Sequence, residues 1–187
     1  LLAKTTPRGQ TGMLVLAPTR ELAVQVHDVL APLARAVKLS TACVYGGVGM
    51  FPQAKALRSG ASIVVATPGR LLDHIQRGNA RLGKVAVLVL DEADRMLDMG
   101  FLPDIRRILA EVPKERQTMM FSATFPPEIA KLTGSMQRNP ARIEIGAIAR
   151  PVDAVRQSLY TVSKDKKTQL LSGILKQDAM ESILVFV

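Results

Sequence analysis

The segment 85–94 constrains the fold of this chain more than any other stretch. Six apolar residues run without a polar break from Val85 to Leu90, and half of them are β-branched. Both faces of such a strand must be covered, which is typical of a central strand in a parallel sheet with helices on each side. Asp91, Glu92 and Asp94 follow directly. Because ligands bind at the carboxyl edge of open α/β sheets, these acids are candidate site residues.

The acidic residues also have a purely structural interpretation. Asp91 and Glu92 can simply cap a short helix expected at 93–97, because acids are favourable near the positive end of a helix. Three carboxylates crowded together are nevertheless costly unless a cation, a water or a hydroxyl group needs them. The choice between the two interpretations depends on the other motifs.

Apolar strands alternate with helical segments along the chain. The expected strands cover residues 13–17, 41–45, 62–66, 85–90, 117–122 and 141–146. The expected helices begin at Pro18 and Pro126 and cover 51–59, 67–78, 93–97 and 102–111. This alternation predicts an α/β fold with a single doubly wound parallel sheet.

The organisation changes after residue 146. We expect a first domain over 1–146 and, because 147–154 has no periodicity and contains Pro151, an interdomain linker there. A strand at 155–162, a helix at 166–176 and an apolar strand at 183–187 follow. These elements are too few to cover an apolar strand, so 155–187 is expected to be the beginning of a second α/β domain.

The excess of basic residues indicates which kind of partner the chain binds. Lys and Arg outnumber Asp and Glu by 25 to 16 in 187 residues, a net charge of +9. This excess favours a polyanionic partner, nucleic acid first, although a merely basic domain is the simpler alternative.

Cys43 is the only cysteine, so no disulfide can form within the chain. His27 and His74 are expected at the surface or at its boundary, and no apolar run approaches a membrane span.

Two expected helix starts share an unusual feature. Thr19 and Thr67 stand at N-cap positions, and Arg20 and Arg70 follow in the first turns. A threonine cap is common, but an arginine there faces the positive end of the helix dipole at a cost of a few tenths of a kcal/mol. Its occurrence at two strand ends suggests a phosphate-binding surface, in which backbone amides and a guanidinium bind the same anion.

Two further strand ends carry candidate residues. Gly46 and Gly47 would let a nucleic-acid backbone approach closely, although a glycine pair is more often just a turn. Ser122 and Thr124 follow the strand expected at 117–122, so their hydroxyls are expected beside the acidic cluster. Thr124 can alternatively cap the helix that begins at Pro126.

One segment nearly matches a phosphate-binding P-loop but does not qualify as one. Residues 78–85 (GNARLGKV) have most of the pattern, but Val85 stands where a serine or threonine must bind magnesium. The segment also lies between an expected helix and an expected strand, the reverse of the P-loop context.

Taken together, the motifs resemble those of the DEAD-box ATP-dependent RNA helicases. The tetrad at 91–94 (DEAD) names that family, and it stands in family order with PTREL at 18–22, the glycine pair, TPGR at 67–70 and SAT at 122–124. The resemblance covers almost all of residues 13–187. The wording DEADRMLDMGF and MMFSATFP is closest to the bacterial RhlE-type branch.

The resemblance implies a RecA-like doubly wound parallel sheet of the P-loop NTPase type, incomplete here, followed by the start of a second RecA-like domain. It implies that Asp91 holds the Mg²⁺ of ATP and that Glu92 orients or deprotonates the attacking water. Asp94 would bind the hydroxyls of Ser122 or Thr124, so that the Ser122, Ala123 and Thr124 segment couples hydrolysis to RNA release. The implied RNA-backbone contacts are Pro18, Thr19, Arg20, Glu21, Gly46, Gly47, Thr67, Pro68, Gly69 and Arg70.

The implied activity is ATP-dependent unwinding of short RNA duplexes by sequence-independent backbone contacts. The resemblance also implies a cytoplasmic protein without membrane contact, with ribonucleoprotein or RNA-decay partners. The family's P-loop and upstream glutamine motif, and the second domain's arginine finger, do not occur in these residues. We therefore expect this polypeptide alone to be catalytically inactive. We also expect the strand that precedes Met13 in the family to be missing from the middle of the sheet.

Two alternatives come from other classes. A non-catalytic RNA-binding module would keep the helix starts at the sheet edge without using ATP. An unrelated α/β hydrolase would use Asp91 and Glu92 with a metal ion, and it would bind metal but no RNA. The second alternative leaves Arg20 and Arg70 unexplained.

Overall fold

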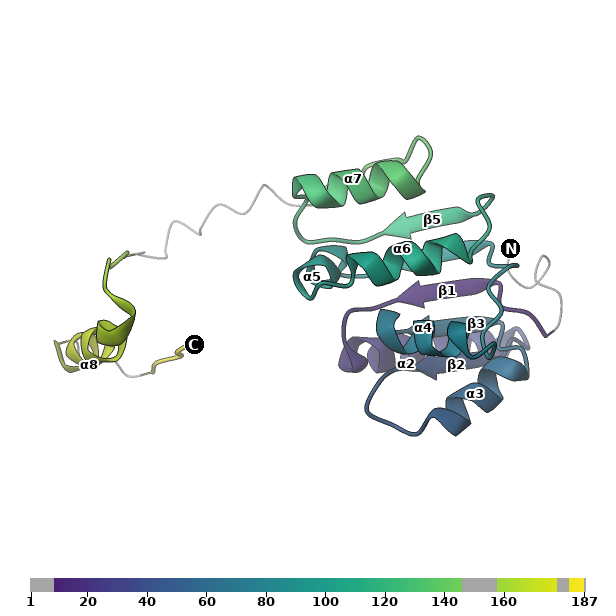
Figure 1. Ribbon diagram of the computed structural model, residues 1–187, viewed down its shortest axis with the longest axis horizontal. Helices are drawn as coiled ribbons and strands as arrows, with labels where there is room; N and C mark the ends of the chain where they lie inside the picture. The colour runs from purple at the N-terminus through teal and green to yellow at the C-terminus, as the bar shows by residue number, and fades with distance from the viewer. Residues whose placement is uncertain (1–8, 146–157, 178–181, 187) are drawn as a thin grey trace. The chain divides into compact units, whose positions relative to one another are not determined.

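The computed structural model describes residues 9–145, 158–177 and 182–186, and its strands form one five-stranded parallel sheet (Figure 1). The strands are β1 (Met13–Leu16), β2 (Thr41–Val44), β3 (Ile63–Ala66), β4 (Val87–Leu90) and β5 (Gln117–Met120). Their order across the sheet is β2-β3-β1-β4-β5. The predicted α/β class and parallel sheet are therefore confirmed.

The carboxyl ends of β1, β3 and β4 are aligned with one another. Leu16 is in register with Ala66 of β3 on one side and with Leu90 of β4 on the other. Because all the strands are parallel, the loops that follow them emerge at one edge. This shared level brings together the motifs that follow the strands.

Helices cover both faces of the sheet. They are α2 (Arg20–Ala36), α3 (Met50–Arg58), α4 (Pro68–Gln76), α5 (Ala93–Asp98), α6 (Leu102–Ala110) and α7 (Pro127–Met136). In Figure 1, α2 lies behind the sheet and α4 and α6 lie in front of it. The larger apolar cluster includes residues of α3 to α7, whereas the smaller one includes residues of α2.

The segment that most constrained the prediction forms the strand β4. Leu88 and Leu90 point into the larger apolar cluster, and Val87 and Val89 point into the smaller one. All four are buried, as an uninterrupted apolar strand requires. The strand begins at Val87, two residues later than predicted, because Val85 bonds back to Leu82 in the turn before it.

The strand ladder has no gap among the described strands. Each neighbour in the order β2-β3-β1-β4-β5 is directly hydrogen-bonded to the next. No strand is therefore missing between any two of the described strands, since β1 pairs with both β3 and β4. The place of the strand that precedes Met13 in the family stays a prediction.

The strand predicted at 141–146 is also wrong over its described residues. Residues 141–145 form no regular element, and Ile143 and Ile145 are 84% and 97% exposed. Their alternating apolar pattern suits a strand, but a strand is stable only with hydrogen-bonded neighbours and a covered face. Neither is present around these described residues.

Contacts divide the chain into two units, Leu1–Pro140 and Ala141–Val187. In the second unit, η1 (Lys164–Lys166) and α8 (Lys167–Gln177) realise the helix predicted at 166–176. The described parts of the two predicted strands, residues 158–162 and 183–186, are not strands, because no partner strand is paired with them. The linker expected at 147–154 lies outside the described residues. The assignment of 155–187 to a second RecA-like domain stays a prediction.

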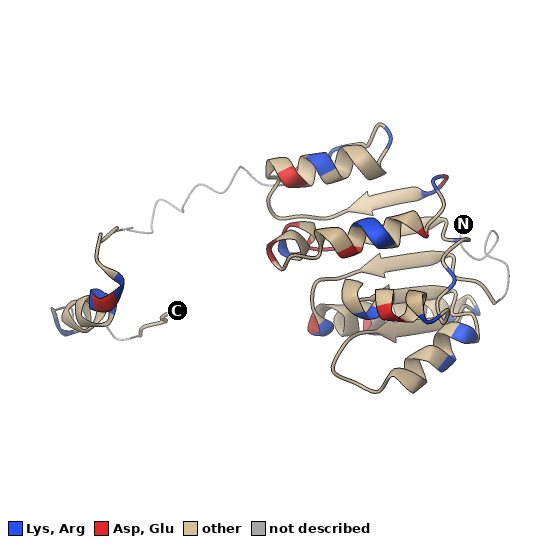
Figure 2. Cartoon of the chain, in the orientation of Figure 1, with Lys and Arg blue, Asp and Glu red and all other residues tan. Residues whose placement is uncertain are grey.

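Charge is spread over the surface of the chain. In Figure 2, Lys and Arg occur on several helices and loops instead of on one face of one helix. The net charge of +9 therefore does not by itself locate a nucleic-acid site. Within the described ranges, no helix is both long enough and apolar enough to cross a bilayer.

Candidate nucleic-acid and nucleotide site

The predicted motifs meet at the carboxyl edge of the sheet, which we call the rim. The rim consists of the loops after the five strands and the first turns of the helices that follow β1, β3 and β4. It contains the candidate residues at 18–21, 46–47, 67–70, 91–94 and 122–124. The prediction that these segments share one edge is therefore confirmed.

Thr19 begins α2 as predicted. Its backbone is extended, and its hydroxyl oxygen accepts a hydrogen bond of 3.2 Å from the amide of Leu22. This side-chain cap satisfies one of the free amides of the first turn. Pro18 beside it is buried, whereas Arg20 and Glu21 are exposed at the start of the helix.

Arg20 lies against the glycine loop that follows β2. Its guanidinium carbon is 5.0 Å from the centre of the Tyr45 ring, a distance at which a cation and an aromatic face attract each other. A Cβ atom added to Gly47 would lie 4.0 Å from Arg20 Nη1. Two motifs far apart in the sequence therefore form one exposed surface.

The glycine pair differs between its two members. Gly46 and Gly47 are both exposed, but only Gly47 has a positive φ, of 80°. This left-handed conformation is easy for glycine and strained for other residues. The interpretation of the pair as a turn is thus correct, and the turn exposes backbone at the rim.

Arg70 is the less exposed of the two predicted phosphate ligands. Its Nη1 donates a 2.9 Å hydrogen bond to the carbonyl oxygen of Val48, and its Nε lies 3.8 Å from Asp73 Oδ2. Its side chain is only 15% exposed. These contacts direct the guanidinium to the glycine loop, so the structure places Arg70 as a brace between α4 and this loop.

The segment before Arg70 is packed more tightly than the start of α2. Thr67 and Pro68 are buried, and Gly69 is half-buried. Thr67 stands at the N-cap position of α4, but its side chain makes no capping hydrogen bond there. The predicted cap is therefore present at Thr19 and not at Thr67.

Asp91 and Glu92 form a tight turn directly after β4. Asp91 Oδ1 accepts a 3.0 Å hydrogen bond from the amide of Glu92. Glu92 has φ 46° and ψ 54°, the left-handed region that costs a non-glycine residue about 1–2 kcal/mol. Its carboxylate is 3.0 Å from Arg95 Nη1. Strain of this kind concentrates at functional sites, where the surrounding structure holds a side chain in place.

Asp94 connects the acidic cluster to the loop after β5. Its Oδ2 accepts two hydrogen bonds from Thr124, one from the amide and one from the hydroxyl, each 2.8 Å long. The amide of Asp94 donates to Ser122 Oγ at 3.2 Å, and Ser122 Oγ donates to the carbonyl oxygen of Thr124 at 2.7 Å. The predicted contact between Asp94 and these hydroxyls is therefore present. Ala123, between Ser122 and Thr124 in the sequence, is exposed.

The same contacts change the acidity of Asp94. Burial raises its pKa, but the hydrogen bonds from the hydroxyl and amide of Thr124 outweigh burial, with help from the Arg95 amide and Ser122. The pKa of Asp94 is lowered as a result. A carboxylate with several donors stays ionised and is held in one orientation.

His74 is placed differently from the prediction. It was expected at the surface or at its boundary, but it is fully buried within α4. Hydrogen bonds to Gln53 and Asn79 satisfy both of its ring nitrogens, which makes this burial possible. In the part of the chain that the structure describes, no three His, Cys, Asp or Glu side chains gather to hold a metal ion.

The sequence interpretation missed several residues around the rim. Tyr45, Gln53, His74 and Arg95 contact or support the predicted motifs. Only Arg95 had a usable signal, because a glutamate and an arginine three residues apart on a helix are neighbours. The contacts of Gln53 and His74 join separate elements, and local spacing does not reveal them.

The fold and the rim define a RecA-like α/β domain. Among solved structures, a DEAD box protein from the hyperthermophile Methanococcus jannaschii is similar, with a TM-score of 0.66 and 39% identity. The match covers 90% of this chain and 45% of that one. A hypothetical ATP-dependent RNA helicase from Sulfolobus tokodaii has a TM-score of 0.64 and 42% identity over 69% of this chain and 39% of that one.

Residues 1–132 match the family described as DEAD/DEAH box helicase. The chain belongs to this family. It is 41% identical to DEAD-box ATP-dependent RNA helicase 40 of Oryza sativa subsp. japonica, over 98% of this chain and 24% of that protein. It is 43% identical to the ATP-dependent RNA helicase RhlB of Pseudomonas putida, over 95% of this chain and 46% of that protein.

The chain thus spans less than half of the length of these curated relatives. These two relatives come from a plant and a bacterium, and neither is named RhlE. Membership of the RhlE-type branch therefore stays a prediction.

Proposed function

We propose that this chain is part of an ATP-dependent RNA helicase, which couples ATP binding and hydrolysis to RNA binding and to local unwinding of short duplexes. Family membership and the names of the relatives support this function. The observation that carries it is the convergence of three separate segments on the rim. Arg20 contacts Tyr45 beside the glycine pair, and Arg70 bonds to Val48 behind it.

The rim suits a sugar-phosphate backbone. Arg20 is exposed at the first turn of α2, where free amides and the helix dipole also favour an anion. Gly46 and Gly47 have no side chains, so a strand can approach their backbone closely. Pro18, Thr19 and Glu21 shape the first helix start, and Thr67, Pro68 and Gly69 shape the second. Such contacts fix position and orientation without reading bases.

The acidic cluster is the proposed nucleotide side of the rim. Magnesium in ATP enzymes is usually held by one or two carboxylates together with phosphate oxygens and water. The half-buried turn after β4 fits this arrangement, with Asp91 as the proposed ligand for Mg²⁺. When bound, Mg²⁺ neutralises phosphate charge. Glu92 is the proposed residue that orients or deprotonates the attacking water.

Asp94 is the proposed link between the nucleotide side and the RNA side. Its bonds to Ser122 and Thr124 tie the turn after β4 to the loop after β5. A displacement of one loop would therefore alter the hydrogen bonds of the other. Ser122, Ala123 and Thr124 are the proposed coupling segment. Ribonucleoprotein or RNA-decay partners and a cytoplasmic location belong to the same proposal.

Comparison of RNA with DNA tests this function. Backbone contacts that include the ribose hydroxyl should bind single-stranded RNAs of different sequence equally, and DNA of the same sequence more weakly. The measurement is fluorescence anisotropy with the full chain at one fixed salt concentration. Equal affinity for RNA and DNA, or a strong preference for one RNA sequence, would contradict the proposed contacts.

A further inference from the structure

His74 is the centre of a buried polar connection between α4, α3 and the glycine loop. Its Nε2 lies 3.2 Å from Gln53 Oε1, and its Nδ1 lies 3.0 Å from Asn79 Nδ2. All three side chains are buried. A polar group in such a position is costly unless every donor and acceptor finds a partner.

The connection has a fixed direction because both of its ends are fixed. Arg58 Nε can only donate, and it lies 2.9 Å from Asn79 Oδ1. The Asn79 amide must therefore donate to His74 Nδ1, and His74 must donate from Nε2 to Gln53 Oε1. At the other end, Gln53 Nε2 donates to the carbonyl oxygen of Tyr45 at 3.0 Å, and this oxygen can only accept.

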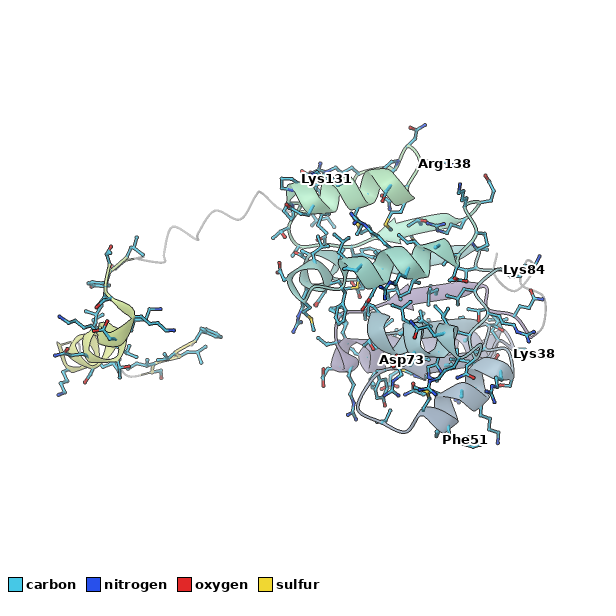
Figure 3. The ribbon with its side chains drawn as sticks, viewed as in Figure 1. Lys38, Phe51, Asp73, Lys84, Lys131 and Arg138 are labelled. Atoms are coloured by element: carbon cyan, nitrogen blue, oxygen red, sulfur yellow. The ribbon has the colours of Figure 1, made fainter. Side chains whose placement is uncertain are left out.

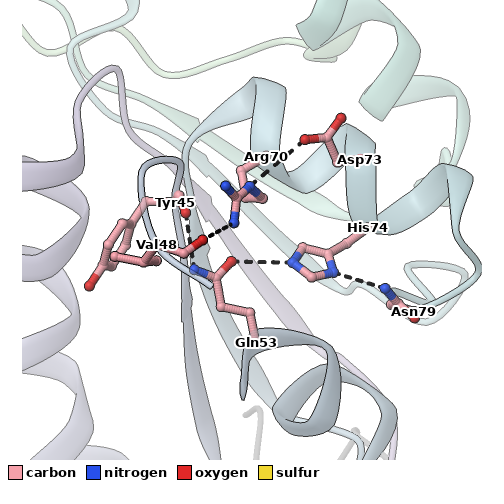
Figure 4. Close-up of polar contacts among 7 residues, drawn as sticks. All are labelled: Tyr45, Val48, Gln53, Arg70, Asp73, His74 and Asn79. Atoms are coloured by element: carbon pink, nitrogen blue, oxygen red, sulfur yellow. Dashed lines mark hydrogen bonds and ion pairs between the residues drawn. The ribbon is translucent and has the colours of Figure 1, made fainter. Parts of the chain in front are cut away.

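This connection ends at the proposed RNA loop. Tyr45 and Val48 lie on either side of the glycine pair, and each of their carbonyl oxygens accepts one side-chain hydrogen bond (Figure 4). The donor to Tyr45 is Gln53 of α3, which His74 orients. The donor to Val48 is Arg70, one turn before His74 on α4. Helix α4 therefore holds both sides of the loop, once directly and once through Gln53.

We propose that Gln53 and His74 are positioning residues for RNA binding, which hold the glycine loop in the conformation that accepts the RNA backbone. This inference rests on the proposed function of the rim. The loop itself has little to order it, since Gly46, Gly47 and Gly49 have no side chains. Ordering a single flexible residue on binding weakens affinity by roughly five- to thirty-fold. A loop that is already ordered avoids this loss.

The direct test removes the hydrogen bond from Gln53 to Tyr45, which we call the tether, and leaves the rim residues in place. In Gln53→Met, a side chain of similar length replaces the amide, so the hydrogen bond to Tyr45 is lost. The matched control is Leu57→Ala on the same helix, because Leu57 is buried in the core and is not part of the connection. Both variants lose stability, but only Gln53→Met releases the loop.

Two measurements separate the inference from the proposed function. Amide hydrogen exchange in the absence of RNA should accelerate at residues 46–49 in Gln53→Met and not in Leu57→Ala. Single-stranded RNA binding should weaken roughly five-fold or more in Gln53→Met. The slope of log K against log salt should also flatten by about 0.7 for each RNA phosphate that the variant no longer neutralises. A loss of stability alone reduces the folded fraction without changing this slope.

Unchanged amide exchange at residues 46–49 in Gln53→Met would show that the Gln53 hydrogen bond to Tyr45 does not order the loop, whatever the RNA affinity of the variant. Faster exchange with an unchanged RNA affinity would overturn the positioning role in binding. An Arg20→Ala variant measured alongside tests the rim itself. If Arg20→Ala binds RNA as well as the wild type while the loop exchange behaves as expected, the proposed function of the rim fails and the tether remains.

Discussion

Asp94 Oδ2 accepts two 2.8 Å hydrogen bonds from a single residue, Thr124, one from its amide and one from its hydroxyl. The two residues are 30 positions apart, and they follow neighbouring strands, β4 and β5. This pair makes the acidic cluster and the loop after β5 one structural unit. The effect of removing either partner should therefore reach both segments.

Replacement of Thr124 by valine should raise the pKa of Asp94 toward its ordinary value, because the hydroxyl donor is lost and burial remains. The lowered pKa of Asp94 stabilises the fold above the unfolded pKa near 3.8, and this contribution is lost as pH falls through the folded pKa. The variant should lose about 1 kcal/mol at neutral pH and less in acid.

Carbon-13 NMR titration of the Asp94 carboxyl measures the shift in this variant. Thr124→Ser is the control, because it keeps a hydroxyl at the same position and should retain the low pKa. An unchanged titration of Asp94 in Thr124→Val would mean that the hydroxyl bond is not a cause of the shift.

The stability of the chain should fall as pH drops below about 6.5, the ordinary pKa of histidine. Burial, Arg70 and Arg77 lower the pKa of His74, while Asp73 acts in the opposite direction. The unfolded state therefore binds a proton at a higher pH than the folded state, so acid favours unfolding until the folded pKa is passed. Urea denaturation at a series of pH values measures this loss.

His74→Gln should be less stable than the wild type at neutral pH and should depend less on pH below 6.5, because the titrating group is gone. Leu72→Ala, a core change on the same helix, should lose stability and keep the wild-type pH dependence. If the pH dependence of His74→Gln equals that of the wild type, His74 does not account for it.

The two glycines of the loop should differ in their tolerance of alanine. Gly47 has a φ of 80°, so Gly47→Ala should cost about 1–2 kcal/mol of backbone strain. Gly46 lacks a positive φ, and no atom would lie within 4 Å of an added Cβ. Gly46→Ala is therefore the matched control and should change stability by less than about 0.5 kcal/mol. Equal losses in urea denaturation would contradict this assignment.

The left-handed backbone of Glu92 should lower the stability of the fold. Glu92→Gly and Glu92→Ala both remove the carboxylate, but only Glu92→Gly also relieves the left-handed strain at φ 46°. The glycine variant should therefore be more stable than the alanine variant by about 1 kcal/mol. Thermal unfolding of the two variants measures the difference. A more stable alanine variant would show that this backbone is not strained.

The sequence predicted those elements whose stability is local or whose pattern has one solution. The apolar run at 87–90 permits only a strand buried on both faces, and Thr19 satisfies the capping rule directly. The alternating residues at 141–145 were misassigned, because a strand exists only when another strand pairs with it. Local pattern contains no information on that partner.

The candidate site shows the same division. The rim followed from the parallel sheet, and the contact of Asp94 with the hydroxyls was expected from family resemblance. The position of Arg70 on Val48, 22 residues away, was not predictable from spacing. Nor was the burial of His74, since its two partners stabilise an otherwise unfavourable location. Contacts between separate elements decide such details.

Single-stranded RNA binding by the full chain across a salt series tests the central claim most directly. Arg20→Ala is compared with Lys84→Ala, which removes the same charge at the opposite edge, just before β4 (Figure 3). If the rim binds RNA, Arg20→Ala should weaken binding and flatten the slope by about 0.7, while Lys84→Ala stays near the wild type. Equal effects of the two variants, or no RNA binding by the folded wild type, would contradict the account.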